Sequence, residues 1–303
     1  MASPLVRRKR LAAELRALRE AAGLTHEQLG KQVGMHRLKI SRLETATTRP
    51  SVPDVMKLLD ALGVTGERWH ALIAVARDGG ERGWWEEYGT DMGVRQQLYA
   101  DLEAGAATIR EYQTVVVPGL LQLPEYIRVR AEQTVRKGEP MPADLSRAVE
   151  ARGARQRMLR RPDGPSYEVV LEELAVRRLG APPEVTAAQL RHLVTLAGEP
   201  AARTTVRVLP IEVALPGYVQ PRTPFSLYAY PDHDDPVVVA VDTETTDLIL
   251  TAQGEVEPYL RLYDQLREAA LPAGESLAFL TEAADRIAAR GSATATARRA
   301  GKR

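Results

Sequence analysis

Cysteine is absent from this chain of 303 residues, and so is any long apolar run. Without cysteine there is no disulfide, no thiolate ligand for a metal and no cysteine nucleophile, which suits a reducing compartment. No stretch approaches the roughly 18 consecutive apolar residues that a membrane-spanning helix needs. The basic run Arg7–Arg10 is followed by charges every third or fourth residue, and not by the apolar core of a signal peptide. These absences predict a soluble, cytoplasmic protein with no membrane partner.

Signatures of catalysis are missing as well. The sequence has no Gly-x-Ser-x-Gly nucleophile motif, no glycine-rich phosphate-binding loop and no zinc-type spacing of His and Cys. The run Asp232–Asp235 places carboxylates around His233, but Pro231 and Pro236 flank it between two strand-like segments, which favours a hairpin loop over a metal site. We therefore predict no enzymatic activity, no cofactor and no metal, and an enzymatic C-terminal part is the least favoured alternative.

What the sequence does contain is an uneven distribution of charge. The whole chain has a net charge of +1. Residues 1–80 hold 14 Lys/Arg against 8 Asp/Glu, a net charge of +6, so the remainder of the chain is negative, at −5. Because the attraction of a surface for phosphate depends on local charge, the N-terminal block is the candidate for contact with nucleic acid. Charge alone does not decide this, since a basic block is often only a solvated surface.

The N-terminal block also contains the pattern of two short helices joined by a tight turn. Apolar residues at helical spacing predict a first helix over about residues 5–22. Thr25 and Gln28 form a capping box at the start of a short second helix, which Gly34 ends. A third helix follows over about residues 35–44. Two short helices around a glycine turn have the geometry of a helix-turn-helix, and two further helical patterns complete a compact all-α domain.

The outward face of the third helix is the predicted contact with DNA. The second helix of a helix-turn-helix enters the major groove, where its N-terminal residues meet base edges. Because the guanidinium group of arginine matches O6 and N7 of guanine, Arg37 and Arg42 are the predicted base-reading residues. Leu38 can contact a thymine methyl group, and the start of the preceding helix can bind phosphate near Thr25 and His26. The predicted DNA-binding residues are Thr25, His26, Gln28, His36, Arg37, Leu38, Lys39, Ser41 and Arg42. The alternative is a surface helix with solvated charges.

Residues 15–51 resemble the lambda-repressor-like Xre/Cro family of DNA-binding domains. The resemblance rests on the runs Arg-Glu-x-x-Gly-Leu-Thr, Ile-Ser-Arg-Leu-Glu and Arg-Pro-Ser. It implies a five-helix domain that binds double-stranded DNA, with Arg19 and Glu44 as a structural ion pair. The chain departs from the family pattern at His36, where members place a Ser or Thr N-cap, and at Ala46, where they place glycine.

Beyond about residue 81 the chain shows helical and strand patterns in alternation. Strands are expected at residues 111–117, 167–171, 204–209, 225–230 and 237–241, and helices at 94–110, 124–136, 142–159, 183–197, 256–270 and 275–289. This mixture predicts an α+β domain with one central sheet over residues 81–290. The last segment, residues 291–303, is rich in Ala, Thr and basic residues without an apolar pattern, and it predicts a disordered basic tail.

The segments "LEAGAATIREYQTVVVPGLLQLPEY" and "VVLEELAVRRLG" resemble the uncharacterised domain that follows an Xre-type helix-turn-helix in many actinobacterial regulators. The resemblance implies no known activity for the domain, but it does imply a regulator. We predict a transcriptional regulator whose C-terminal domain serves in dimerisation, partner binding or ligand sensing. Such regulators are often encoded beside a small partner protein. The alternative is therefore an antitoxin-like interaction protein that sequesters a small protein and autoregulates its operon.

We further expect a homodimer on DNA. One module contacts only about half a helical turn, and helix-turn-helix proteins usually gain affinity by placing two recognition helices about 34 Å apart. The C-terminal helices have apolar residues that could form the dimer contact or could simply cover the sheet. The residues concerned are Leu260, Tyr263, Leu266, Leu277 and Leu280.

Overall fold

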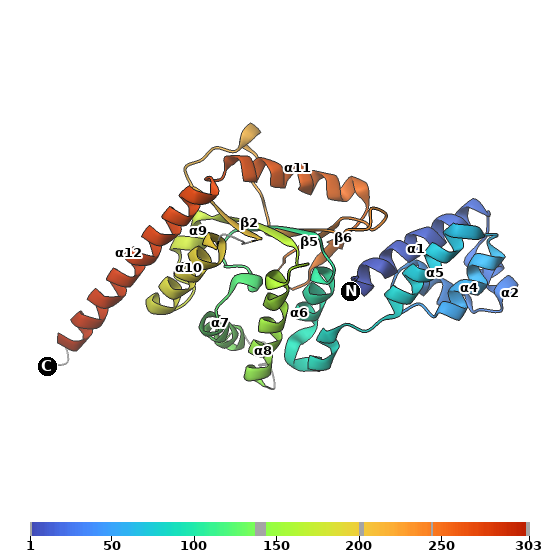
Figure 1. Cartoon of the computed structure of the whole chain (residues 1–303), viewed down its shortest axis with the longest axis horizontal. Helices are drawn as coiled ribbons and strands as arrows, with labels where there is room; N and C mark the ends of the chain where they lie inside the picture. Colours follow the sequence, from blue (N-terminus) through green and yellow to red (C-terminus); the bar gives the residue numbers. More distant parts are fainter. Residues whose placement is uncertain (1, 137–143, 200–202, 244, 301–303) are drawn as a thin grey trace.

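A computed structural model of the chain describes residues 2–136, 144–199, 203–243 and 245–300. A helical N-terminal domain is followed by a domain built on a sheet, and the first helix runs from one to the other (Figure 1). The helices of the N-terminal domain are α1 (Pro4–Ala21), α2 (His26–Val33), α3 (Arg37–Glu44), α4 (Val52–Ala61) and α5 (Gly66–Gly80). Within the described ranges, no helix combines the length and the apolar composition needed to cross a bilayer.

The core of the N-terminal domain is formed by the apolar stripes of these helices. Its buried side chains are Leu11, Leu15, Leu29, Ile40, Leu43, Val55, Leu58, Leu59, Val64, Leu72, Ile73, Val75 and Ala76. Gly30 allows α2 and α3 to approach closely, because a Cβ atom there would lie 2.5 Å from the carbonyl oxygen of Met35. Ala46, at the position where the resembling family has glycine, takes a left-handed φ of 55°.

The second domain begins with a short 3-10 helix, Trp84–Tyr88, and alternates helices with strands. Its helices are α6 (Gly89–Glu103), α7 (Pro124–Arg136), α8 (Leu145–Gln156), α9 (Glu173–Arg177), α10 (Pro183–Gly198), α11 (Gln253–Ala269) and α12 (Ala273–Ala300). Its strands are β1 (Thr108–Gln113), β2 (Ser166–Glu172), β3 (Thr204–Leu209), β4 (Phe225–Ala229), β5 (Val238–Val241) and β6 (Leu248–Leu250).

The strands form one six-stranded sheet in the order β3-β2-β1-β4-β5-β6, which agrees with the predicted single sheet. β1, β2 and β3 run parallel, and β4, β5 and β6 continue the sheet in antiparallel pairs. The parallel half needs crossover connections, which α7 with α8 and α9 with α10 supply. Helices are therefore interleaved with strands in the first half of the domain and follow them in the second half.

Both faces of the sheet are covered by helices. On one face α11 packs Tyr263 and Leu266 against Tyr112 and Phe225. On the other face lie α6, α7, α8, α10 and α12 (Figure 1), and Leu280 of α12 is fully buried there. The apolar residues considered as a dimer contact thus cover the sheet instead, with Leu260 and Leu277 partly buried against the same two cores. Tyr263, Leu266 and Leu280 are therefore not available for a dimer contact.

Several sequence expectations need adjustment. The strand expected over residues 111–117 is β1, which begins at Thr108 and already ends at Gln113. The helix expected over residues 94–110 ends at Glu103, because Gly105 takes a φ of 72° and β1 begins soon after. The three-residue strand β6 and the one-and-a-half-turn helix α9 were not expected. α12 continues to Ala300, into the segment expected to be disordered, and residues 301–303 lie outside the described residues.

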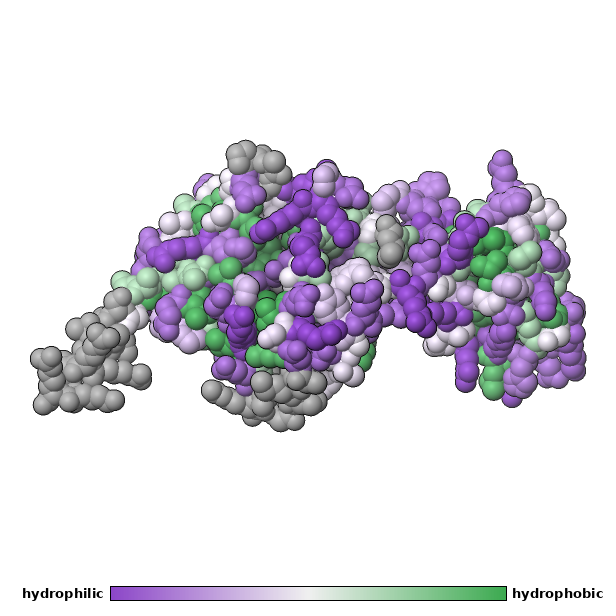
Figure 2. Space-filling model, turned by 60° about the horizontal axis from the view of Figure 1, so that its bottom comes forward, coloured by the Kyte–Doolittle hydropathy of each residue, from purple (hydrophilic) through white to green (hydrophobic). Residues whose placement is uncertain are grey.

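The two domains meet at the first turns of α1. Val6 is fully buried as part of the second domain's core. The Ser3 hydroxyl donates to Asp101 Oδ1 of α6 at 2.8 Å, and Arg10 donates to Asp232 in the β4–β5 loop at 2.8 Å. Hydrophilic side chains gather where the two domains adjoin (Figure 2). α1 is therefore a structural part of both domains.

Candidate nucleic-acid interface

The helix pair α2–α3 is fixed by local hydrogen bonds at its two starts. Thr25 Oγ1 accepts from the N–H of Gln28 at 3.2 Å, and Gln28 Oε1 accepts from the N–H of Thr25 at 2.9 Å. These bonds complete the expected capping box. Gly34 ends α2 with a φ of 67°, and α3 begins at Arg37. The tight left-handed turn leaves only a short link between the two helices.

His36 takes over the capping role at the start of α3. Its Nδ1 atom accepts from the N–H of Leu38 at 3.3 Å, where the resembling family would use a hydroxyl. In this bond a ring nitrogen acts as the acceptor in place of a hydroxyl oxygen. His36 thereby supports the helix that carries the predicted base readers.

The outward face of α3 carries cations that the protein does not neutralise. Arg37 and Arg42 are exposed, and neither guanidinium group has a hydrogen bond or an ion pair within the described residues. Leu38 beside them is 51% exposed, although leucine usually turns inward on a helix. Ser41 is half-buried on the same helix, while Ile40 and Leu43 are buried in the core. The expected division of α3 into inward and outward faces is therefore present.

Besides the capping residues, Lys39 and His26 among the predicted contact residues have partners on other helices. The Lys39 ammonium group lies 2.6 Å from a carboxylate oxygen of Asp54 on α4. His26 Nε2 lies 3.0 Å from Glu44 Oε2. These side chains must exchange an existing partner for phosphate before they contact DNA. The structure thus places them with the framework of the domain, and leaves Arg37 and Arg42 as the unengaged cations of α3 among the described residues.

Arg19 and Glu44 form the ion pair that the resemblance implied. Arg19 donates to both oxygens of Glu44, from Nε at 2.7 Å and from Nη2 at 2.8 Å, and its third nitrogen donates to the carbonyl of Leu24 at 2.8 Å. Burial favours the neutral acid, but hydrogen bonds from Arg19 and His26 outweigh it and lower the pKa of Glu44. The pair ties the end of α1 to the end of α3 and so fixes the orientation of α3.

Most of the basic run at the N-terminus does not face solvent as free charge. Arg7 and Arg10 both donate to Asp232 at 2.8 Å, and Arg8 lies 3.6 Å from Asp101. The net charge of +6 over residues 1–80 therefore overstates the charge available to phosphate. Sequence reasoning missed this because the acidic partners lie more than 90 residues further along the chain.

The acidic run Asp232–Asp235 forms the loop between β4 and β5, as expected for a hairpin. Asp232, His233 and Asp234 bring ligand atoms within 4.8 Å of one another, a spacing that would suit a metal ion. The carboxylates of Asp232 and Asp234, however, accept hydrogen bonds from Arg10 at 2.8 Å. These arginine contacts favour the hairpin interpretation of the loop over a metal site.

Comparison with known families divides the chain as the structure does. Residues 10–72 match a family described as "Helix-turn-helix domain". Residues 96–282 match a family described as "Domain of unknown function (DUF5753)". No curated protein and no solved structure matches the chain. The first match contains α2 and α3, and the second contains the whole sheet.

Proposed function

Because the chain belongs to the DUF5753 family and carries a helix-turn-helix domain ahead of that domain, we propose that it is a sequence-specific DNA-binding transcriptional regulator. In this proposal α3 lies in the major groove of double-stranded DNA. The sheet domain holds α1 and thereby positions α3. The N-terminal domain is of the lambda-repressor-like type that residues 15–51 resemble.

One observation carries the proposal: Arg37 and Arg42 are exposed at the start and near the end of α3, with no partner among the described residues. An arginine with an unoccupied guanidinium fork is suited to bidentate hydrogen bonds with O6 and N7 of guanine. Exposed Leu38 between them is suited to a thymine methyl group. The capped starts of α2 and α3 add backbone N–H groups that can bind phosphate.

A homodimer is part of the proposal. A single α3 reads only a few base pairs, and the carboxylates around Arg7 and Arg10 reduce the charge available for phosphate. Two copies would place two α3 helices on one face of the duplex, about one helical turn apart. The operator is then expected to contain two related half-sites at that spacing.

The test begins with sites selected by the full-length protein from random double-stranded DNA. Replacing Arg37 or Arg42 with Ala should weaken binding to a selected site by about 1–3 kcal/mol, with little change on random DNA at the same salt concentration. Arg68→Ala is the matched control, because Arg68 is exposed on α5 and pairs with Glu14. Equal losses of affinity for selected and random DNA would show that both arginines contact phosphate and not base edges. Selected sites without paired half-sites would contradict the proposed homodimer.

A further inference from the structure

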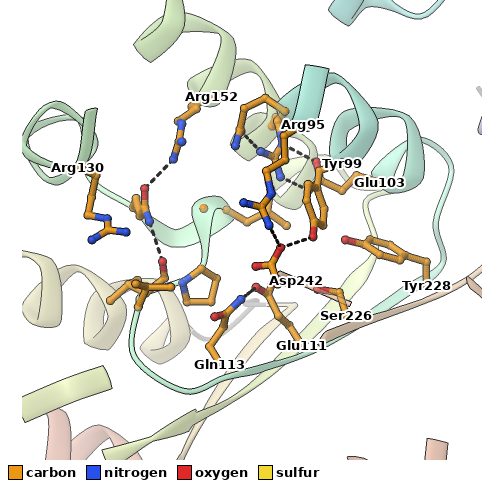
Figure 3. Close-up of a pocket in the computed structure, with 18 of the residues that line it drawn as sticks. Arg95, Tyr99, Glu103, Glu111, Gln113, Arg130, Arg152, Ser226, Tyr228 and Asp242 are labelled. Carbon is orange, nitrogen blue, oxygen red and sulfur yellow. Dashed lines mark hydrogen bonds and ion pairs between the residues drawn. The ribbon is translucent and has the colours of Figure 1, made fainter. Parts of the chain in front are cut away.

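A polar cavity of about 330 Å³ lies between the centre of the sheet and helices α6, α7 and α8 (Figure 3). Glu111 and Gln113 of β1 and Ser226 of β4 form its floor, and arginines from the helices form much of its wall. This volume is at the lower end of the range for small-molecule sites, and it suits a ligand the size of a small metabolite.

The floor of the cavity is chemically unlike the rest of the same sheet face. Over β2 and β3 that face is filled by apolar residues such as Val169 and Val206. Glu111, Gln113 and Ser226 occupy equivalent inward positions and are also buried. Burying polar groups costs free energy unless each finds a partner, so a sheet that only had to be covered would be apolar here as well. The polar floor therefore points to a bound ligand.

One arginine in the wall of the cavity lacks a carboxylate partner. Two others are neutralised within the protein, in the pairs Arg155–Glu103 and Arg95–Asp242. Arg152 donates instead to the neutral Oε1 atom of Gln122 at 2.8 Å, and it has no ion pair among the described residues. Burial, with Arg155 and Arg130 nearby, lowers the pKa of Arg152 to about 10. An anionic group in the cavity would relieve this uncompensated charge.

The floor offers hydrogen-bond acceptors in place of cations. Glu111 accepts from Gln113 Nε2 at 2.8 Å and from the Tyr167 hydroxyl at 2.6 Å. Gln113 Oε1 is buried and has no hydrogen-bond partner within the described part of the chain, although Gln113 lines the cavity. Buried amide oxygens are rarely left in this state, because the missing bond costs about 1–3 kcal/mol. A ligand N–H group would complete the bonding of this oxygen.

From these two sides of one cavity we propose that the sheet domain binds a small zwitterion. Its carboxylate or phosphate group contacts Arg152, and its ammonium group donates to Gln113 Oε1 and to Glu111. Arg152 and Arg130 lie on one side of the cavity in the close-up, and Glu111 and Gln113 lie below (Figure 3). The assignment is independent of DNA binding, and it gives this domain a ligand-binding role.

The test uses the full-length protein in thermal unfolding with a panel of zwitterions at millimolar concentration. The panel consists of the twenty standard amino acids, γ-aminobutyrate and phosphoethanolamine, with acetate and inorganic phosphate as anions that lack an ammonium group. A compound at about 100 times its dissociation constant should raise the Tm by about 5–10 °C. A panel without any shift, or equal shifts with acetate or phosphate, would overturn the proposal.

Two variants separate ligand binding from a structural role. Arg152→Met and Gln113→Met should each abolish the ligand-induced shift. Each variant also loses one hydrogen bond, from Gln113 to Glu111 or from Arg152 to Gln122, so the Tm of each ligand-free variant is the baseline for its own shift. Arg128→Gln is the control, since Arg128 is exposed on α7 and outside the cavity, and it should retain the full shift. If Arg152→Met does not fold, Gln113→Met alone decides. A ligand shift that persists in a folded Gln113→Met variant would overturn the proposed site.

Discussion

On α3 of the N-terminal domain, the two cations without a partner among the described residues, Arg37 and Arg42, are exposed. In the sheet domain, Arg152 has no carboxylate partner among the described residues and lines a cavity of about 330 Å³. The first arrangement leaves charge on a convex surface, where an extended polyanion can reach it. The second leaves charge in a cavity of limited volume, where only a small molecule fits. The position of the uncompensated arginine thus indicates what kind of partner each domain can bind.

The buried charges of the two domains differ in the same way. In the N-terminal domain, Arg19 satisfies both oxygens of Glu44, so this pair acts only as framework. In the sheet domain, the buried pair Arg155–Glu103 lines the same cavity as Gln113, whose Oε1 atom has no hydrogen-bond partner among the described residues. The hydrogen bonds between Arg19 and Glu44 hold α3 in place. Gln113 Oε1, which has no partner among the described residues, can still accept a hydrogen bond from a ligand.

The largest expected effect concerns the Arg19–Glu44 framework. Replacing Glu44 with Ala leaves a buried arginine without its carboxylate, and it should lower the free energy of unfolding of the N-terminal domain by about 3–5 kcal/mol. The double variant Arg19→Met/Glu44→Leu should lose less, because no charge is left uncompensated. Urea unfolding of the full-length chain measures the loss, and hydrogen exchange of the α1–α5 amides locates it. Single variants within about 0.5 kcal/mol of the parent protein would show that the pair is not framework.

The N-terminal domain could be predicted almost completely from its sequence. Its determinants are local: the capping box of Thr25 and Gln28, the glycine turn at Gly34, and apolar residues at helical spacing. The outward face of α3 followed from the inward positions of its neighbours. What the sequence could not show were the partners of Lys39 and His26, because Asp54 and Glu44 approach them only in the folded domain.

The sheet domain was predictable only in outline. Four expected strands and the helices α7, α10 and α11 lie close to their predicted residues, whereas β6 is too short to leave a pattern. The cavity was missed because its residues come from strands and helices more than 100 residues apart. One local signal was present: Glu111 and Gln113 are polar at alternate positions of a strand whose other inward residue, Ile109, is buried.

The next prediction, in order of expected size, tests whether burial in the cavity floor favours the neutral form of Glu111. Burial raises the pKa of Glu111 to about 7, despite hydrogen bonds from Tyr167 and Gln113. Because this folded-state pKa lies above the unfolded value, the stability that neutral Glu111 contributes is fully present below about pH 4.5 and is lost as pH rises through 7. Glu111→Gln stays neutral, so its stability relative to the parent should rise by about 2 kcal/mol between pH 5 and 8.

Chemical unfolding of both proteins across this pH range measures that difference. Glu125→Gln is the control, because Glu125 is an exposed carboxylate on α7 outside the cavity. A constant difference between Glu111→Gln and the parent would mean that Glu111 is ionised throughout. The cavity floor would then stabilise a charged carboxylate, as the N-terminal domain does for Glu44. The difference between the two domains would be smaller than the geometry indicates.

The smallest effect concerns the contact that joins the two domains. Arg10 and Asp232 are 10% and 34% exposed and lie 2.8 Å apart, so solvent screens them only in part. Burial opposes ionisation of Asp232, but hydrogen bonds from Arg10 and Arg7 lower its pKa, so the contact persists down to acidic pH. A double-mutant cycle with Arg10→Ala and Asp232→Ala should give a coupling of about 1 kcal/mol that decreases with added salt. The exposed pair Arg191–Asp285 between α10 and α12 should give a coupling near zero. If the coupling for Arg10 and Asp232 is as small as that of the exposed pair, the contact between the domains is weak. Arg10 would then be available to bind phosphate.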